Sequence, residues 1–324
     1  MWRPEAETRD PATRPWFTRL DDDAREAARR LTKIVPRPFH QLGVEASRRV
    51  RFPVLQRGPE VFDVRDVEIE VAGGVIEARI YRPADEIGLP MLVYFHGGGF
   101  FLGSIGGVDA LCRGLAVRSG CVVVSVGYRL APEHPFPVPA DDCLAAALWA
   151  AGHAGDWGAD PARVALGGDS AGATLAVSTA IGLHGLGAAA PSCLLLAYPA
   201  VDLTFSAPSW TEFADAPLIT TEDARWTWEM YLGEHGADDP RAVPNRADDL
   251  SFLPPTLVLT AEVDVLRDDA AAFANRLAGE GVTARHRRYP GVFHGFFTEL
   301  GLYRRTGLAV AESAGFLRQV HRMP

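Results

Sequence analysis

Apolar and polar residues alternate in two early segments of the chain, residues 67–71 and 76–81. This alternation predicts strands with one buried and one exposed face, because successive side chains of a strand point to opposite sides. Gly73 and Gly74 stand between the two segments and predict a tight hairpin turn. We therefore expect the first strands to form an antiparallel pair.

From residue 90 onward the pattern changes to short, continuous apolar runs. These runs cover residues 91–95, 122–126, 164–166, 194–197 and 256–260. Such runs are typical of strands buried on both faces, as in a parallel sheet covered by helices. The helix-like stretches between and after them cover residues 108–118, 140–152, 171–184, 268–279 and 303–320. Strand and helix in alternation predict an α/β fold with an antiparallel start.

Two segments stand outside this alternation. Residues 1–55 are rich in proline and contain one predicted amphipathic helix at residues 21–34, which starts with three aspartates at the positive end of the helix dipole. Residues 203–247 form the second segment. Its aromatic residues are Phe205, Trp210, Phe213, Trp226, Trp228 and Tyr231. Neither segment fits into the predicted sheet.

The charge balance is acidic and unevenly distributed. The 324 residues carry a formal net charge of −9. This argues against nucleic acid or an anionic membrane surface as the main partner, because both bind concentrated positive charge. Residues 1–60 nevertheless hold 13 basic and 9 acidic residues, against 19 and 32 in the rest of the chain.

The remaining composition predicts a soluble cytoplasmic protein. No apolar run reaches the roughly 18 residues that a membrane span needs, and the first residues lack the apolar core of a signal peptide. The four cysteines, at positions 112, 121, 143 and 193, are far apart and have no metal-ligand spacing. We interpret them as small buried side chains in a reducing compartment, and predict neither a disulfide framework nor a metal site.

The strongest chemical signal is the sequence Gly-Asp-Ser-Ala-Gly at residues 168–172, which follows a buried strand and opens a helix of small residues. A nucleophilic serine needs a sharp strand-to-helix turn that exposes its hydroxyl. Glycines two residues before and after it avoid collisions across that turn. We therefore predict Ser170 as a nucleophile, and interpret Asp169 as structural or as a source of polarity. The alternative is an ordinary glycine-flanked helix start.

A glycine-rich loop, His-Gly-Gly-Gly-Phe at residues 96–100, directly follows the first buried strand. Its backbone N–H groups, with that of Ala171, can hold the oxyanion of a tetrahedral intermediate. A phosphate-binding loop is the competing interpretation. The glycine patterns of such loops are absent, however, and the only lysine, Lys33, is far away in the sequence.

A serine nucleophile needs a base and an orienting acid, which should follow it in the order acid, then histidine. His294 lies in a glycine-bounded loop between the last predicted strand and helix, which is the place for a base. His286 and His321 are interpreted as solvent-exposed. Asp264 ends a strand at its carboxyl edge and is the predicted acid. Asp202 also follows a strand and is the reserve candidate.

Four blocks of the chain together resemble the hormone-sensitive-lipase-like esterases of the α/β-hydrolase fold, also called bacterial lipolytic family IV. The blocks are residues 94–100, 128–137, 168–172 and the pair 264–268 with 294–296. They extend over about residues 90–300 and are highly specific in combination. One departure is Val265, which stands where the family usually has proline after the acid.

The resemblance implies a mostly parallel eight-stranded sheet flanked by helices, with a helical cap over the site. It implies that residues 1–55 are an N-terminal cap segment and residues 203–247 a cap insert. The catalytic domain would then consist of residues 56–202 and 248–324.

The resemblance also implies a role for individual residues. Ser170 would be the nucleophile, Asp264 the acid and His294 the base, while His96 would shape the glycine loop. The implied oxyanion hole consists of Gly97, Gly98 and Ala171. The residues expected to line the substrate pocket are Phe100, Phe101, Trp210, Phe213 and Leu218. The residues expected to form internal salt bridges in the scaffold are Arg129, Glu133 and Asp142.

We therefore expect a serine carboxylesterase that hydrolyses short- to medium-chain acyl esters through an acyl-enzyme, with no metal or organic cofactor. One alternative is an amidase or a deacetylase of a secondary metabolite on the same triad. A non-catalytic small-molecule receptor is disfavoured, because receptors of this family lack the histidine that His294 supplies.

The expected partner is a small-molecule acyl ester, without nucleic acid and without a membrane span. A homodimer is a further expectation, since family members often dimerise through the last strand and final helix. Against it, the arginines of that strand are typical of a protected sheet edge. They are Arg285, Arg287 and Arg288.

Overall fold

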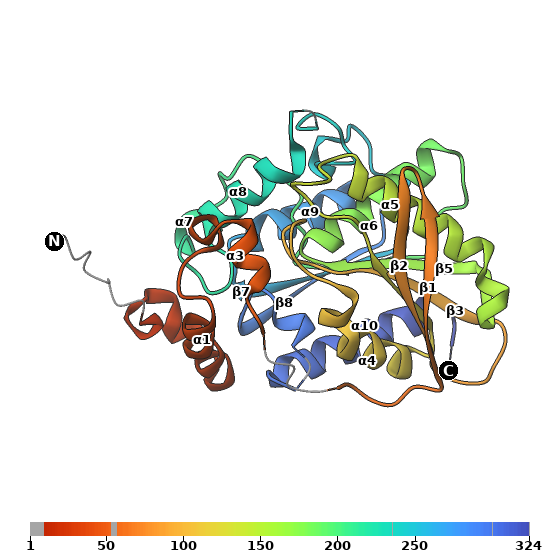
Figure 1. Cartoon of the computed structure of the whole chain (residues 1–324), viewed down its shortest axis with the longest axis horizontal. Coiled ribbons are helices and arrows are strands. Elements are labelled where there is room, and N and C mark those ends of the chain that lie inside the picture. The colour runs from red at the N-terminus through yellow and green to blue at the C-terminus, as the bar shows by residue number, and fades with distance from the viewer. Residues whose placement is uncertain (1–9, 53–56, 235, 300, 324) are drawn as a thin grey trace.

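A computed structural model of the chain describes residues 10–52, 57–234, 236–299 and 301–323. The chain folds around one eight-stranded sheet with the strand order β1-β2-β4-β3-β5-β6-β7-β8 (Figure 1). The β1–β2 and β2–β4 pairs are antiparallel, and every other pair is parallel. This confirms the predicted α/β fold, a mostly parallel eight-stranded sheet with an antiparallel start.

The predicted strands all form, and most extend beyond the predicted bounds. They are β1 (Asp63–Val71), β2 (Gly74–Arg82), β3 (Leu89–Phe95), β4 (Val122–Gly127), β5 (Ala159–Asp169), β6 (Leu194–Ala197), β7 (Thr256–Val263) and β8 (Ala284–Phe293). One detail of the hairpin differs from the prediction. Val71 pairs with Gly74, so the turn consists of Ala72 and Gly73, and Gly74 already belongs to β2.

Helices cover both faces of the sheet (Figure 1). On one face, α4 (Asp109–Ser119) contacts α10 (Arg304–Val320), and on the other α5 (Val138–Gly152) contacts α6 (Ala171–Gly185). The helix α9 (Arg267–Gly279) packs against β7 and β8. Every residue of β3 is buried between these layers, as its continuous apolar run predicts. All four cysteines are buried and free of disulfide bonds.

The strand order reverses beside β3, and this reversal determines where a site can form. The chain crosses from β3 to β4 on one side and then returns to β5 on the other. The loops that leave the carboxyl ends of β3 and β5 therefore diverge and leave a crevice, which is where open α/β sheets bind ligands. The register aligns these ends, because Phe95 pairs with Gly168 and, farther along the sheet, Val263 pairs with Phe293.

The N-terminal segment (residues 10–50) lies next to the insert (residues 203–247) at one end of the sheet (Figure 1). The N-terminal segment contains η1 (Pro11–Thr13), η2 (Pro15–Arg19), α1 (Asp22–Ile34), α2 (Phe39–Leu42) and α3 (Val44–Arg49). The insert contains α7 (Ser209–Glu212), α8 (Thr221–Leu232) and η5 (Pro244–Arg246). The remaining short helices are η3 (Ile105–Val108), η4 (Ala154–Trp157) and η6 (Phe296–Thr298). Residues 1–9 and 53–55 of the predicted cap segment lie outside the described residues.

Polar contacts join the N-terminal segment to the insert. The Trp16 indole N–H donates to Asp215 at 2.8 Å, and Arg14 forms an ion pair with the same carboxylate at 3.0 Å. His40 places its Nδ1 2.8 Å from the buried carboxylate of Asp223. Part of the positive charge in the first 60 residues therefore lies in ion pairs with acidic residues of the insert, such as Arg14 with Asp215.

The scaffold salt bridges confirm one prediction and correct another. Arg129 pairs with the buried Asp142 at 2.6 Å, as predicted. Glu133 does not join them. It pairs with Arg48 of the N-terminal segment at 2.7 Å, and this hydrogen-bonded contact lowers the pKa of Glu133 to about 2. The difference arises because Arg48 approaches from a segment that is distant in the chain and close only in the folded state.

Within the described residues, no helix is long and apolar enough to cross a membrane. The strand β8 lies at an edge of the sheet, and its three arginines are exposed there. These arginines contact Gln319, Glu312 and Asp268 of neighbouring helices. The expectation of a homodimer stays a prediction.

Candidate active site

Ser170 sits in a sharp turn between β5 and α6, with backbone angles φ 52° and ψ −123°. Residues other than glycine rarely adopt positive φ, so the surroundings must hold this conformation in place. The two flanking glycines show how. A Cβ on Gly168 would collide with the Gly172 carbonyl, and a Cβ on Gly172 would collide with the backbone oxygen of Phe95. The turn therefore forms only with glycine at both positions.

The structure brings the predicted nucleophile, base and acid together. His294 Nε2 lies 2.9 Å from Ser170 Oγ, and His294 Nδ1 lies 2.8 Å from Asp264 Oδ2. Asp264 is fully buried, and its Oδ1 accepts the Leu266 N–H at 2.9 Å. This second hydrogen bond orients the carboxylate even though Val265 replaces the expected proline. The ring of Tyr198 lies against the His294 imidazole, with centroids 4.6 Å apart.

The other candidates lie apart from this constellation. Asp202 accepts hydrogen bonds from the Thr204 N–H and the Asn245 side chain. His286 is exposed, as predicted. His321 is buried, which corrects the sequence-based expectation. Its Nε2 lies 2.8 Å from Ser192 Oγ, and burial lowers its pKa to about 4.

The glycine loop is anchored by Asp169, whose importance for this loop the sequence interpretation missed. The Gly97 N–H donates to Asp169 Oδ1 at 3.0 Å, and the Tyr94 hydroxyl donates to the same oxygen at 2.9 Å. In contrast, the N–H groups of Gly98, Gly99 and Ala171 form no hydrogen bond within the described residues. Gly97 thus has its donor engaged inside the protein, whereas Gly98 and Gly99 line the same cavity as Ser170 with their donors free.

His96 stacks on Tyr128 with ring centroids 4.4 Å apart, and its Nδ1 lies 2.8 Å from the Gly97 carbonyl oxygen. Burial lowers the pKa of His96 to about 4, so its imidazole is neutral near pH 7. These contacts fit the predicted role in shaping the loop.

Asp169 is buried beside the nucleophile, and burial raises its pKa from 3.8 to about 6. Because the folded-state pKa exceeds the unfolded value, the native state holds an extra proton between these two pH values. The contribution of Asp169 to the stability of the protein therefore falls as the pH rises through this window. Two pKa units correspond to about 3 kcal/mol.

Asp169→Asn is expected to remove this loss of stability, because asparagine keeps an oxygen acceptor for Gly97 and Tyr94 without the buried charge. The free energy of unfolding of the variant minus that of the wild type should rise by about 2 kcal/mol between pH 4 and pH 7. Urea denaturation at several pH values measures this difference.

Asp202→Asn is the control and should show the opposite trend, because the pKa of Asp202 is lowered. Burial raises this pKa, but hydrogen bonds from Asn245 and Thr204 outweigh the effect of burial. A parallel pH dependence of Asp169→Asn and the wild type would contradict this prediction.

A cavity of about 240 Å³ reaches Ser170 and is called the serine cavity below. The glycine loop, His294, Phe101 and Leu218 line it. The other three residues expected in the pocket lie elsewhere: Phe100 stacks on Tyr231 at 3.8 Å, the indole N–H of Trp210 donates to Asp269, and Phe213 lies beneath the guanidinium groups of Arg19 and Arg267. Of the five residues predicted to contact substrate, only Phe101 and Leu218 line the serine cavity.

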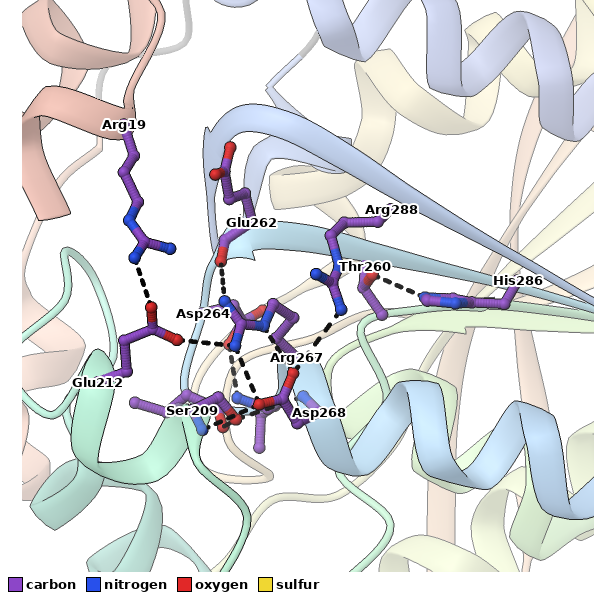
Figure 2. A network of polar contacts seen from close by, with 12 residues as sticks. Arg19, Ser209, Glu212, Thr260, Glu262, Asp264, Arg267, Asp268, His286 and Arg288 are labelled. Atoms are coloured by element: carbon purple, nitrogen blue, oxygen red, sulfur yellow. Dashed lines mark hydrogen bonds and ion pairs between the residues drawn. The ribbon is translucent and has the colours of Figure 1, made fainter.

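A polar network joins the insert to the residues that directly follow Asp264 in the chain (Figure 2). The guanidinium group of Arg267 pairs with Asp268 at 2.7 Å and with Glu212 of the insert at 2.8 Å. Glu212 also pairs with Arg19 of the N-terminal segment at 2.6 Å, so three parts of the chain meet there. Ser209 adds a hydrogen bond from its hydroxyl to the Val265 carbonyl at 2.7 Å.

In the part of the chain that the structure describes, no group of His, Cys, Asp and Glu side chains has the arrangement of a metal site. The ionisable groups of the serine cavity are three acids and two histidines, namely Asp169, Asp223, Glu299, His96 and His294. Burial, and then the charge of Asp169, raises the pKa of Glu299. The contact between Ser170 Oγ and His294 Nε2 is an arrangement in which a histidine can accept the proton of a serine nucleophile.

Comparisons with known proteins show the family to which the chain belongs. Residues 92–298 match the family model described as alpha/beta hydrolase fold. The chain is 38% identical to the esterase LipI of Mycobacterium tuberculosis over 267 residues, which cover 80% of this chain and 83% of that protein. It is 34% identical to the ethyl acetate hydrolase of Pseudomonas putida over 283 residues, which cover 84% and 88% of the two chains.

Among solved structures, the hyperthermophilic esterase from the archaeon Pyrobaculum calidifontis superimposes with a TM-score of 0.85 at 37% identity, covering 93% of this chain and 99% of that chain. The chain therefore belongs to the hormone-sensitive-lipase-like family of α/β hydrolases, as the sequence motifs predicted. It is a carboxylic ester hydrolase.

Proposed function

We propose that the protein hydrolyses short- to medium-chain acyl esters by two-step acyl transfer, with Ser170 as nucleophile, His294 as base and Asp264 as orienting acid. The observation that carries the proposal is the unbroken chain of contacts, 2.9 Å from Ser170 Oγ to His294 Nε2 and 2.8 Å from His294 Nδ1 to Asp264 Oδ2. This is the arrangement in which a histidine accepts a hydroxyl proton while a carboxylate holds its ring.

In the first step, Ser170 Oγ attacks the ester carbonyl carbon and His294 Nε2 takes its proton. The bond from this carbon to the alcohol oxygen then breaks, and His294 returns the proton to the leaving alcohol. In the second step, water attacks the acyl-enzyme with His294 again accepting a proton, and the carboxylic acid leaves as Ser170 regains its hydrogen. Asp264 stabilises the imidazolium in both steps.

The oxyanion of each tetrahedral intermediate is stabilised, in this proposal, by the N–H groups of Gly98, Gly99 and Ala171. The support is that these donors are free of internal partners, whereas the Gly97 N–H is used on Asp169. This changes the set implied by the sequence resemblance by one residue. Each such donor contributes on the order of 3 kcal/mol to transition-state stabilisation.

The N-terminal segment and the insert would together form the cap over this site. The supporting observation is that Phe39 of the N-terminal segment and Leu218 and Thr227 of the insert all line the serine cavity. A cavity of about 240 Å³ with mostly apolar walls fits a short to medium acyl chain better than a long one.

A substrate panel tests the proposed function. We expect p-nitrophenyl esters from acetate to octanoate to be hydrolysed with higher kcat/KM than palmitate, and the matching p-nitroanilides to be hydrolysed far more slowly, because the amine is the poorer leaving group. Acetylated alcohols serve as a third arm for a deacetylase. Faster turnover of the anilides than of the esters would favour the amidase alternative, and an optimum at palmitate would contradict the proposed chain length.

A further inference from the structure

Leu218 of the insert lies where three cavities meet. Besides the serine cavity, two neighbouring cavities of about 100 Å³ each adjoin this residue. The outer cavity lies between the N-terminal segment and the insert, and the side cavity lies between α1 and the loop after His294. Among the described residues that line these cavities, Leu218 alone faces all three.

The backbone holds Leu218 in an unusual conformation at this junction. Its φ is 70°, a left-handed value that leucine rarely adopts. A Cβ built on Gly295 would lie 2.6 Å from Leu218 Cδ2, so the leucine side chain rests directly on the residue after His294. The surrounding packing holds this strained backbone in place beside the site. Strained residues of this kind cluster at functional sites, which points to a functional role for the Leu218 side chain.

The outer cavity has mixed walls, of which the larger part is apolar. Its apolar lining residues include Trp16, Val35, Phe39 and Pro217, and its polar ones include Thr32, Arg37 and Thr220. The acidic groups at its wall already have partners within the protein: Asp215 is paired with Arg14, and Asp223 accepts from the backbone N–H of His40 and contacts its ring. An apolar chain entering this space therefore contacts the apolar side chains without displacing the partner of either carboxylate.

The outer cavity and the serine cavity share three lining residues, Phe39, Leu218 and Asp223. Phe39 packs edge-on against Phe101, and Asp223 is fixed by the N-terminal cap of α8 as well as by His40. Leu218 belongs to the short, irregular stretch between α7 and α8. Its side chain takes part in neither a hydrogen bond nor an aromatic pair, so it is the part of the shared wall whose length can be changed without breaking either kind of contact.

We propose that Leu218 is the wall that limits substrate chain length, and that the outer cavity behind it is an additional subsite for the far end of a linear hydrocarbon chain. In the wild type the chain of the ester ends against Leu218. When the leucine is shortened, the serine cavity and the outer cavity join, and the chain extends between the N-terminal segment and the insert. This inference rests on the proposed ester hydrolysis at Ser170.

The test compares Leu218→Ala with the wild type on p-nitrophenyl esters from acetate to palmitate and on acetates of linear primary alcohols. The first series lengthens the acyl chain and the second lengthens the alcohol. We expect one of the two series to shift its optimum to longer chains in Leu218→Ala. For each added methylene that the joined cavity buries, kcat/KM should rise about fourfold relative to the wild type, which corresponds to about 0.8 kcal/mol per methylene.

Three further variants define the result. Leu218→Phe keeps the wall closed and should give no gain on long chains. Leu218→Gly opens it fully and suits the positive φ at this position, so it should give a gain at least as large and keeps the test open if Leu218→Ala folds poorly. Leu232→Ala makes the same truncation in the same insert, at the end of α8 and away from all three cavities, and should leave chain preference unchanged.

The quantity compared is the ratio of kcat/KM for long and short chains, which does not depend on the fraction of folded enzyme. An unchanged ratio in Leu218→Ala for both series, or an equal shift in Leu232→Ala, would overturn the inference. Failure of the proposed function itself gives a different result, because the wild type would then hydrolyse no ester in either series.

Discussion

Ser170→Ala is expected to lower kcat for p-nitrophenyl butyrate by on the order of a millionfold, because removal of the nucleophile leaves only the oxyanion donors and substrate binding. KM and the thermal unfolding midpoint should stay close to those of the wild type, since Ser170 Oγ makes its one described hydrogen bond to His294. The same variant should no longer react with a p-nitrophenyl alkylphosphonate, which in the wild type should attach to Ser170 with release of p-nitrophenolate.

The matched control is Ser104→Ala, which removes another serine hydroxyl that lines the serine cavity. Ser104 accepts a hydrogen bond from the Gly107 N–H at the start of η3 and has no contact with His294. Its turnover and its phosphonate labelling should remain close to those of the wild type. Labelling of Ser170→Ala at the wild-type rate, or residual turnover similar to that of Ser104→Ala, would show that another group is the nucleophile.

Asp264→Asn is expected to lower kcat by about 10⁴-fold near pH 7 with little change in KM. The carboxylate of Asp264 accepts from His294 Nδ1 and stabilises the imidazolium that forms as Ser170 loses its proton. An amide carries no charge, and its NH₂ group can turn toward the imidazole and favour the tautomer in which Nε2 cannot accept that proton. Steady-state kinetics from pH 6 to pH 9 measure both effects.

Asp202→Asn is the informative comparison for this second prediction, because Asp202 also follows a strand and was the reserve candidate for the acid. Its carboxylate is held by Asn245 and Thr204 and has no contact with His294. The kcat of Asp202→Asn should stay within about tenfold of the wild-type value, because Asp202 does not contact the residues that react. A loss in Asp202→Asn as large as that in Asp264→Asn would contradict the assignment of the acid.

The sequence predicted those features that depend on local sterics and on strand pattern. Gly168 and Gly172 indicated the turn around Ser170, since side chains at these positions collide with the backbone. Asp264 and His294 were predicted from their places after strands, and the parallel pairing of Val263 with Phe293 brings the two residues side by side. Both inferences need only the order of residues and the geometry of a parallel sheet.

Partner choice by side chains could not be predicted in the same way. Gly97 and Asp169 are separated by 72 residues in the chain, and only the folded sheet shows that the glycine N–H is used on this carboxylate. His321 looked solvent-exposed near the chain end, yet it is buried and lies beside Ser192, 129 residues away. Glu133 likewise pairs with Arg48 and not within its own block.

The sequence by itself determined the α/β class, the strand ends that carry chemistry and the identity of Ser170, Asp264 and His294 as candidates. These follow from backbone sterics and periodicity, which act over a few residues. Only the tertiary structure decided which glycine donors stay free, which aromatic residues reach the serine cavity and where Leu218 lies between three cavities. Such features depend on which distant segments pack together, and close packing selects among many partners that are equivalent in the sequence.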